Sequence, residues 1–220
     1  MIALQWCRLS GGRLMREIVI ISDAALRKRR RIERLLSITL IVLALDTVYL
    51  SWRFVALFVG WVEPGTGICS WSATIDCDIV LQTPEARAFA VPNAILGLGF
   101  YTGCLIWWFG WRRLGIGYSA HMVRSLAVWL GIASLISFWF WNLLFRLPAL
   151  CPFCPWNHIL TYVALGLAIW VWRLTPHPPE RQPLRPLLFL VAACVGWFWL
   201  WQFGWFVAEL SGVLARQGRV

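Results

Sequence analysis

Charge is scarce in this sequence, and its scarcity excludes most soluble proteins. Only 14% of the 220 residues are charged, 60% are hydrophobic, and the mean hydropathy is +0.69. A soluble domain usually has about a quarter charged residues and about half apolar ones. Because the chain has more apolar side chain than its own core can bury, we expect the lipid bilayer to be its solvent.

Other signals are missing as well. No segment alternates apolar and polar residues with period two, which argues against a β-barrel. Neither an internal repeat nor a soluble domain is recognisable. The first 22 residues contain Arg13, Arg16 and Glu17 and lack an apolar core before a small-residue cleavage site, so they do not resemble a cleaved signal peptide. Met15 is an alternative start, with Met1–Leu14 as an extension.

Long apolar runs are abundant, and they predict an all-α membrane protein with five spans. A span needs roughly 20 mostly apolar residues. The runs are Leu35–Trp52, Val91–Trp111, Ser125–Phe145, Cys154–Trp172 and Leu187–Val207. The apolar stretch Phe54–Val62 is too short to cross, so we expect it to continue the first helix along the interface.

Basic residues give the orientation. With the N-terminus inside, the outer segments hold only Arg53, Arg87, Arg146, Arg216 and Arg219, and the other 15 of the 20 Lys and Arg lie inside. The positive-inside rule then places loop 53–92 and residues 146–153 on the extracytoplasmic side. The cytoplasmic parts are a basic segment (1–34) and a Pro-rich, extended connection (173–186), and residues 208–220 form a short tail. The run Arg27–Arg31 precedes a span, so it indicates topology and contact with anionic lipid rather than nucleic acid.

This topology sorts the seven cysteines. Cys7 lies in the reducing cytoplasm, and Cys104 and Cys194 lie in apolar helices, where a free Cys is usually a small hydrophobe. The other four fall on the outer side, where thiols can be oxidised. They are Cys69 and Cys77 in the first outer loop, and Cys151 and Cys154 in the sequence Cys-Pro-Phe-Cys that opens the fourth span.

The spacing of Cys151 and Cys154 favours redox chemistry. At a helix start, unpaired backbone N–H groups and the helix dipole favour a thiolate. A structural disulfide is the alternative, but a disulfide stabilises a fold most when it closes a long loop, and this one would close a very short loop. Cys69 and Cys77 alone would suit a static bridge. Beside a second dithiol they form a relay, because exchange proceeds through mixed disulfides. Zinc binding by the four thiolates is disfavoured, since nothing resembles a zinc knuckle.

The order of these elements resembles the vitamin K epoxide reductase family. The resemblance rests on the loop pair, one helix, a helix pair and then Cys-x-x-Cys, and it covers about 35–172, the family's four-helix core. Phe89–Tyr101, with Asn93 and Gly97, looks like the family's entry into its second helix. The segment Asp76-Cys77-Asp78 resembles bacterial members.

The resemblance implies a four-helix bundle around a quinone of the menaquinone or ubiquinone class, with no metal. Cys154 would react with the quinone, Cys151 would exchange with Cys77, and Cys69 would meet the thiols of a partner protein. Asn93 would hydrogen-bond a quinone carbonyl; the alternative is a residue that satisfies backbone groups at a helix start.

Three further positions are less specific. His158 lies one turn beyond Cys154, where the family often has a Tyr, and it could donate to the quinone or carry a proton, or cap the membrane interface instead. Thr83 matches a family hydroxyl position. Asp46 in the first span belongs either to the interface or to the pocket.

The sequence therefore predicts a quinone-dependent thiol oxidoreductase of the bacterial inner membrane that supports disulfide bond formation. Bacterial members often carry a thioredoxin-like domain after a fifth helix; because none is recognisable here, we expect a separate extracytoplasmic thioredoxin-like donor. A DsbB-type oxidase would have the two cysteine pairs in the reverse order. Reduction of vitamin K epoxide, and a non-catalytic subunit with static bridges, remain as alternatives.

Overall fold

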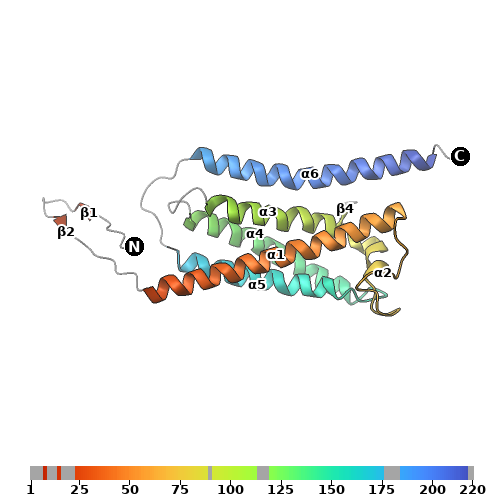
Figure 1. The fold of residues 1–220 in the computed structure, drawn as a ribbon, viewed down its shortest axis with the longest axis horizontal. Coiled ribbons are helices and arrows are strands. Elements are labelled where there is room, and N and C mark those ends of the chain that lie inside the picture. Colours follow the sequence, from red (N-terminus) through yellow and green to blue (C-terminus); the bar gives the residue numbers. More distant parts are fainter. Residues whose placement is uncertain are drawn as a thin grey trace.

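A computed structural model describes residues 7–8, 14–15, 23–88, 91–112, 119–175 and 184–217 (Figure 1). Its helices are α1 (Asp23–Val59), α2 (Cys77–Gln82), α3 (Asn93–Arg112), α4 (Ser119–Leu144), α5 (Phe153–Arg173) and α6 (Leu184–Gln217), with a 3₁₀ turn, η1 (Pro84–Ala86). Two short antiparallel ladders pair β1 (Cys7–Arg8) with β2 (Leu14–Met15) and β3 (Arg87–Ala88) with β4 (Val91–Pro92).

Five of the described helices, all but α2, are long and apolar enough to cross a membrane, which confirms the prediction of an all-α membrane protein. Their ends differ from the apolar runs. The basic run Arg27–Arg31 is part of α1, and the helix continues through Phe54 to Val59. The second span begins at Asn93 rather than Val91, because a residue before a proline disfavours the helical conformation. Most of the predicted connection 173–186 lies outside the described residues.

Four helices form a ring. Helix α1 packs against α3 and α5, and α4 completes the ring by packing against α5 and α3. Helix α6 lies outside it, along α3 (Figure 1). The Trp197 indole of α6 donates to Thr102 Oγ1 of α3 at 2.7 Å, and Trp205 packs edge-on against Phe54 and Phe58 of α1. The fifth span therefore covers the bundle without entering its centre.

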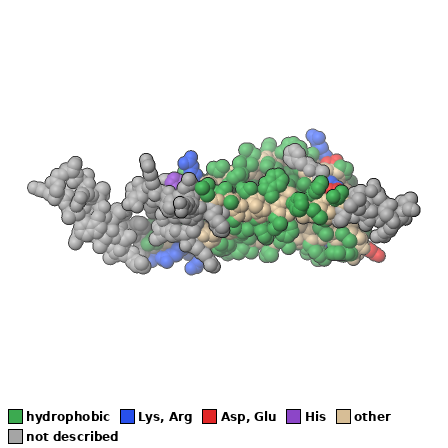
Figure 2. Space-filling view, turned by 90° about the horizontal axis from the view of Figure 1, so that it is seen from above, with side chains coloured by type: hydrophobic (Ala, Val, Ile, Leu, Met, Phe, Trp, Pro, Cys, Tyr) green, Lys and Arg blue, Asp and Glu red, His purple; other side chains and the backbone are tan. Residues whose placement is uncertain are grey.

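The core follows the helical period of α1. One stripe of that helix is buried, at Ile32, Leu36, Leu40, Leu43, Thr47, Leu50 and Phe54, with the spacing of three and four residues expected for a single face. The opposite face exposes Leu35, Ile38 and Leu45, which suits contact with lipid. Figure 2 shows hydrophobic side chains over the middle of the molecule, and Lys and Arg near the end where α1 begins.

The other end of the bundle, here called the cysteine end, is closed by residues 60–88 and by the α4–α5 connection. The backbone N–H of Leu150 donates to Thr74 O at 2.9 Å, and that of Asp76 donates to Leu150 O at 3.1 Å. These two bonds join the loop that carries Cys77 to the segment that precedes Cys151. Two cysteines from distant parts of the sequence are thereby brought to one place.

Candidate active site

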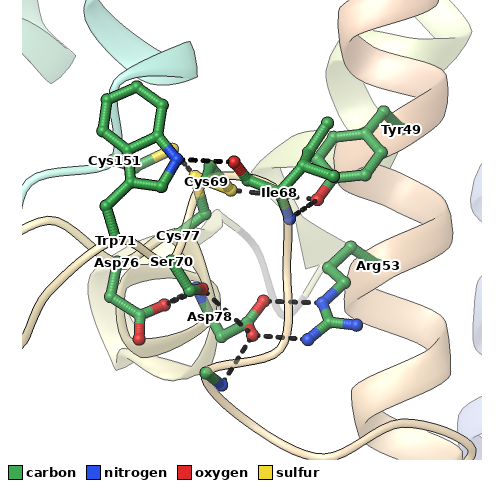
Figure 3. Close-up of a disulfide and its surroundings, with 11 residues drawn as sticks. Tyr49, Arg53, Ile68, Cys69, Ser70, Trp71, Asp76, Cys77, Asp78 and Cys151 are labelled. Carbon is green, nitrogen blue, oxygen red and sulfur yellow. Dashed lines mark hydrogen bonds and ion pairs between the residues drawn. A yellow bond between two sulfur atoms is a disulfide. The ribbon is translucent and has the colours of Figure 1, made fainter.

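Four cysteines meet at the cysteine end. Cys69 and Cys77 form a disulfide, and the Cys151 thiol lies 3.0 Å from Cys77 Sγ (Figure 3). Cys69, Cys77 and Cys151 each have 0% exposure. Cys151 is a free thiol, and so is Cys154. The site therefore holds one disulfide and one dithiol, with a thiol sulfur next to a disulfide sulfur.

Cys77 is held at the first position of the short helix α2. Asp76 caps this helix, because its carboxylate accepts the backbone N–H of Asp78 at 2.7 Å and the Ser70 hydroxyl at 2.6 Å. Thr83 ends it with a hydroxyl that donates to Val80 O at 2.8 Å. The hydroxyl position predicted from the family pattern thus has a local structural role at the end of α2.

Cys151 and Cys154 lie at the start of α5, as their spacing predicts. Pro152 is the N-cap, Phe153 begins the helix, and the backbone N–H of Cys154 donates to Cys151 O at 3.2 Å. The Cys154 side chain packs against the buried cluster that contains Cys77 and Cys151. Cys151 therefore touches both its neighbour Cys154 and the loop residue Cys77, and it is the link between the two pairs.

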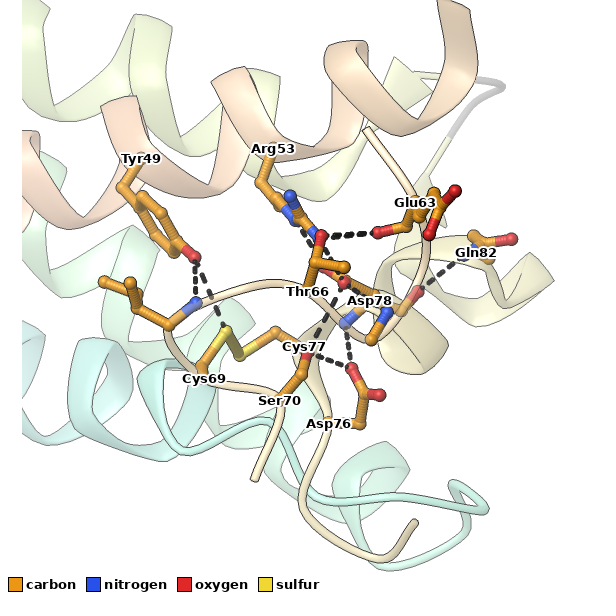
Figure 4. A network of polar contacts seen from close by, with 12 residues as sticks. Tyr49, Arg53, Glu63, Thr66, Cys69, Ser70, Asp76, Cys77, Asp78 and Gln82 are labelled. Carbon is orange, nitrogen blue, oxygen red and sulfur yellow. Dashed lines mark hydrogen bonds and ion pairs between the residues drawn. A yellow bond between two sulfur atoms is a disulfide. The ribbon is translucent and has the colours of Figure 1, made fainter. Parts of the chain in front are cut away.

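A buried ion pair holds in place the loop that carries Cys69 and Cys77 (Figure 4). The Arg53 guanidinium, near the end of α1, donates to both carboxylate oxygens of Asp78, at 2.8 and 2.6 Å. The Arg53 and Asp78 side chains are 4% and 0% exposed. Gly65 N also donates to Asp78 at 2.9 Å. Burial alone would raise the pKa of Asp78, but the hydrogen bonds from Arg53 and Gly65 and the Arg53 charge lower it below its usual value.

Tyr49 reaches the disulfide from α1. Its hydroxyl oxygen accepts the Ile68 backbone N–H at 3.2 Å and lies 3.9 Å from Cys69 Sγ. Its ring packs against Phe153 of α5, with 5.4 Å between ring centroids. Tyr49 thus contacts both segments that carry the cysteine pairs.

The two residues expected to bind the quinone have different surroundings. Asn93 begins α3, and its amide donates to Glu85 O at 3.0 Å, while Oδ1 is buried without a partner among the described residues. The His158 ring lies against Phe140 and Trp141 of α4, and its Nδ1 is likewise buried and unpaired within the described part of the chain. Both side chains keep a polar atom with which a ligand could bond.

Asp46 is buried and belongs to a polar network inside the bundle. Asn157 Nδ2 donates to Asp46 Oδ2 at 2.7 Å, and the Tyr101 hydroxyl donates to Asn157 Oδ1 at 3.0 Å. The Tyr101 hydroxyl also lies 2.7 Å from Thr161 Oγ1. Since Asn157 follows Cys154 by nearly one turn of α5, this network adjoins the dithiol.

Sequence reasoning missed Arg53, Tyr49 and Asn157. Arg53 counted there only as one of the few basic residues outside, and Tyr49 was one of several aromatic residues near a span end. The local signal that was available is the pair of acidic residues flanking Cys77. A buried Asp beside a cysteine requires a partner, and the basic residue in the same outer segment was the natural candidate.

A disulfide, a dithiol in contact with it and a bundle of membrane helices define the class of this molecule as a membrane thiol oxidoreductase. The chain belongs to the vitamin K epoxide reductase family, whose model matches residues 34–172. No curated protein and no solved structure matches the chain. The family region covers α1 from residue 34 onward, α3, α4 and all but the last residue of α5, and it ends before α6.

Proposed function

We propose that the chain is a quinone-dependent oxidase of protein thiols that supports disulfide bond formation. Electrons enter from a separate thioredoxin-like protein at Cys69, pass through Cys77 to Cys151 and Cys154, and leave on a membrane quinone. The observation that carries this proposal is the 3.0 Å contact between Cys151 Sγ and Cys77 Sγ, because disulfide exchange requires one sulfur to attack another.

The redox state of the site supports this order of transfer. The loop pair is oxidised and the Cys151–Cys154 pair is reduced, which is the arrangement after electrons have left the loop and before they leave the protein. In the preceding step the Cys77 thiolate attacks Cys151 of a Cys151–Cys154 disulfide, and Cys154 leaves with the electron pair. Cys69 then attacks Cys77 and releases Cys151.

The residues near Cys154 fit a quinone. The cysteines lie in an apolar cluster with Ala94 and Ile95, which directly follow Asn93 in α3. Asn93 has an unpaired Oδ1 that can accept a quinol hydroxyl, and one N–H remains to donate to a quinone carbonyl. His158 Nδ1 is a second candidate contact. When bound, the quinone supplies a two-electron acceptor, and the chain's part is to hold it beside Cys154 and to supply the electrons.

The distribution of charge supports a bacterial inner-membrane orientation with the cysteine end outside. The exposed residues Arg27, Arg30 and Arg31 lie at the opposite end of α1, where basic residues mark the cytoplasmic side. A donor protein in an oxidising compartment then approaches the loop that carries Cys69 from outside, and the loop must open to expose the buried sulfur.

The test is quinone reduction by the purified full chain in detergent, with a reduced thioredoxin-like protein as the donor. We expect wild type to turn over, Cys154→Ala to lose all activity, and Cys77→Ala to lose the reaction driven by the donor. Cys104→Ala, in the apolar core away from the site, is the control and should retain activity. If wild type reduces no quinone and the cysteine pairs resist thiol reductants, the site is a static bridge and the proposal is wrong.

A further inference from the structure

The Tyr49 hydroxyl can donate one hydrogen bond, and one sulfur lies within reach to accept it. Its oxygen already accepts the Ile68 N–H at 3.2 Å, so the hydroxyl hydrogen is free to point elsewhere. Among the described residues, the other polar atom in contact with this oxygen is Cys69 Sγ, at 3.9 Å, within reach of a hydrogen bond to sulfur. The backbone donor therefore orients the hydroxyl hydrogen toward Cys69.

The position of the ring is fixed from two sides. Phe153 packs against it from α5, and Trp52 packs against it from the next turn of α1, with 6.2 Å between the ring centroids. Tyr49 lies on the membrane helix and Cys69 lies in the loop, so the contact joins a rigid element to the residue that must change its bonding. Figure 3 shows the hydroxyl directed toward Ile68 and Cys69.

Three sulfurs lie in series beside this hydroxyl. Cys151 Sγ contacts Cys77 Sγ, Cys77 is bonded to Cys69, and the hydroxyl lies at the Cys69 end of the series. When the Cys69–Cys77 bond forms from the Cys77–Cys151 mixed disulfide, or breaks to regenerate it, Cys69 is the sulfur that carries the negative charge. A hydrogen-bond donor at that sulfur favours its charged form.

We propose that Tyr49 is a catalytic residue of the relay, in which its hydroxyl donates a hydrogen bond to Cys69 and stabilises the Cys69 thiolate. This assignment rests on the proposed function. In the forward step the Cys69 thiol loses its proton to water, and the thiolate attacks Cys77 of the Cys77–Cys151 mixed disulfide. The Cys69–Cys77 bond forms, the Cys77–Cys151 bond breaks, and Cys151 leaves with the electron pair and takes up a proton. Tyr49 keeps its own proton throughout.

The experiment uses the full chain with Cys154→Ala, which removes the exit to Cys154 and needs neither quinone nor donor protein. The Cys69–Cys77 disulfide with free Cys151 then interconverts with the Cys77–Cys151 disulfide with free Cys69, without any oxidant. The protein is incubated until the ratio of the two forms is constant, quenched with acid, alkylated and analysed by non-reducing mass spectrometry. The same ratio is measured in the double variant Cys154→Ala/Tyr49→Phe. The matched control is Cys154→Ala/Tyr162→Phe, because Tyr162 lies on the exposed side of α5.

At about pH 9, where an ordinary cysteine is largely ionised, we expect Tyr49→Phe to lower the ratio of mixed to loop disulfide about tenfold. At about pH 5, where the thiols are protonated, the ratio should change less than about twofold. Tyr162→Phe should match its parent at both pH values. A loss that depends on pH is the result that a purely structural role of the hydroxyl would not produce.

Two other results would overturn the assignment, and they differ from each other. If the mixed disulfide forms and Tyr49→Phe leaves its ratio unchanged at both pH values, the relay stands and Tyr49 has no part in it. If Cys154→Ala forms no Cys77–Cys151 disulfide at any pH, the relay itself fails, and the role of Tyr49 fails with it.

Discussion

The Arg53 guanidinium holds both oxygens of the Asp78 carboxylate, at 2.8 and 2.6 Å, and so ties the end of α1 to the helix that carries Cys77. Replacing Arg53 with Met leaves a buried carboxylate without its charge partner. We expect the free energy of unfolding to fall by about 3–5 kcal/mol, measured by denaturant titration in detergent.

Two variants test whether this loss comes from the uncompensated charge. The double variant Arg53→Met/Asp78→Leu should recover most of the stability, because both charges are removed together. Arg87→Met breaks an ion pair with Glu209 that is about one third exposed on both sides, and it should cost at most about 1 kcal/mol. Equal losses for Arg53→Met and Arg87→Met would contradict the importance of burial.

The lowered pKa of Asp78 predicts how stability depends on pH. A carboxyl whose pKa is lower in the folded than in the unfolded protein stabilises the fold above its unfolded pKa of about 3.9. This contribution is lost as the pH falls through the folded pKa. We expect the melting temperature of wild type to fall below about pH 4, and that of Asp78→Asn to be lower at neutral pH and to change less in acid. Parallel curves for the two proteins would show that Asp78 does not contribute.

Gly97 lets α3 approach α1 closely. A Cβ at this position would lie 3.0 Å from Thr47 Cγ2. Thr47 cannot easily turn away, because its hydroxyl donates to Leu43 O and Ala44 O, each at 3.0 Å. We therefore expect Gly97→Ala to lower the free energy of unfolding by about 1–2 kcal/mol, in spite of the higher helix propensity of Ala.

A smaller side chain at position 47 should relieve the close contact that Gly97→Ala creates. Thr47→Ser keeps the hydroxyl and removes the methyl group, so the double variant Gly97→Ala/Thr47→Ser should be at least as stable as wild type. Gly103→Ala is the control, because a Cβ at this position would meet nothing within 4 Å. Its free energy of unfolding should rise by up to about 1 kcal/mol, owing to the higher helix propensity of Ala. A destabilised Gly103→Ala would mean that the loss at Gly97 has another cause.

Asn157 joins α5 to the buried carboxyl of Asp46. Oδ1 of Asp46 is already without a partner among the described residues, so Asn157→Leu would leave both carboxyl oxygens unpaired. We expect a loss of about 1–2 kcal/mol in thermal or denaturant unfolding in detergent. Asn142→Leu is the matched control, because the exposed Asn142 amide bonds only to Phe138 O of its own helix in the described structure. If both variants lose the same stability, the network adds nothing beyond a surface amide.

The fold was largely predictable because the bilayer imposes one simple requirement on each span. Runs of about 20 apolar residues located the five helices of membrane-spanning length in the described part of the chain, and the differences lie at the helix ends. The expected start of the second span at Val91 was wrong because it was based on hydropathy alone and ignored Pro92. At Arg27–Arg31 the charges were expected to precede the first helix, but the helix already includes them.

The site was predictable where chemistry follows from local spacing, and not where it depends on distant contacts. The Cys-x-x-Cys sequence predicted its position at the start of α5. No local pattern links Arg53 to Asp78 or Asp46 to Asn157, because these pairs are formed by packing. His158 was placed by helical spacing alone beside Cys154, and that spacing carried no information about its contact with Phe140 and Trp141.

The continuity of α1 sets the distance between its basic N-terminal part and the redox centre. The stretch from Arg29 to Tyr49 is unbroken helix and rises about 30 Å, which is about the thickness of the hydrocarbon layer. If the arginines stand among the lipid headgroups of one leaflet, Tyr49 and the sulfurs beside it stand at the headgroups of the other. Because the helix is unbroken, it acts as a spacer that holds the sulfurs at a constant distance from the arginines.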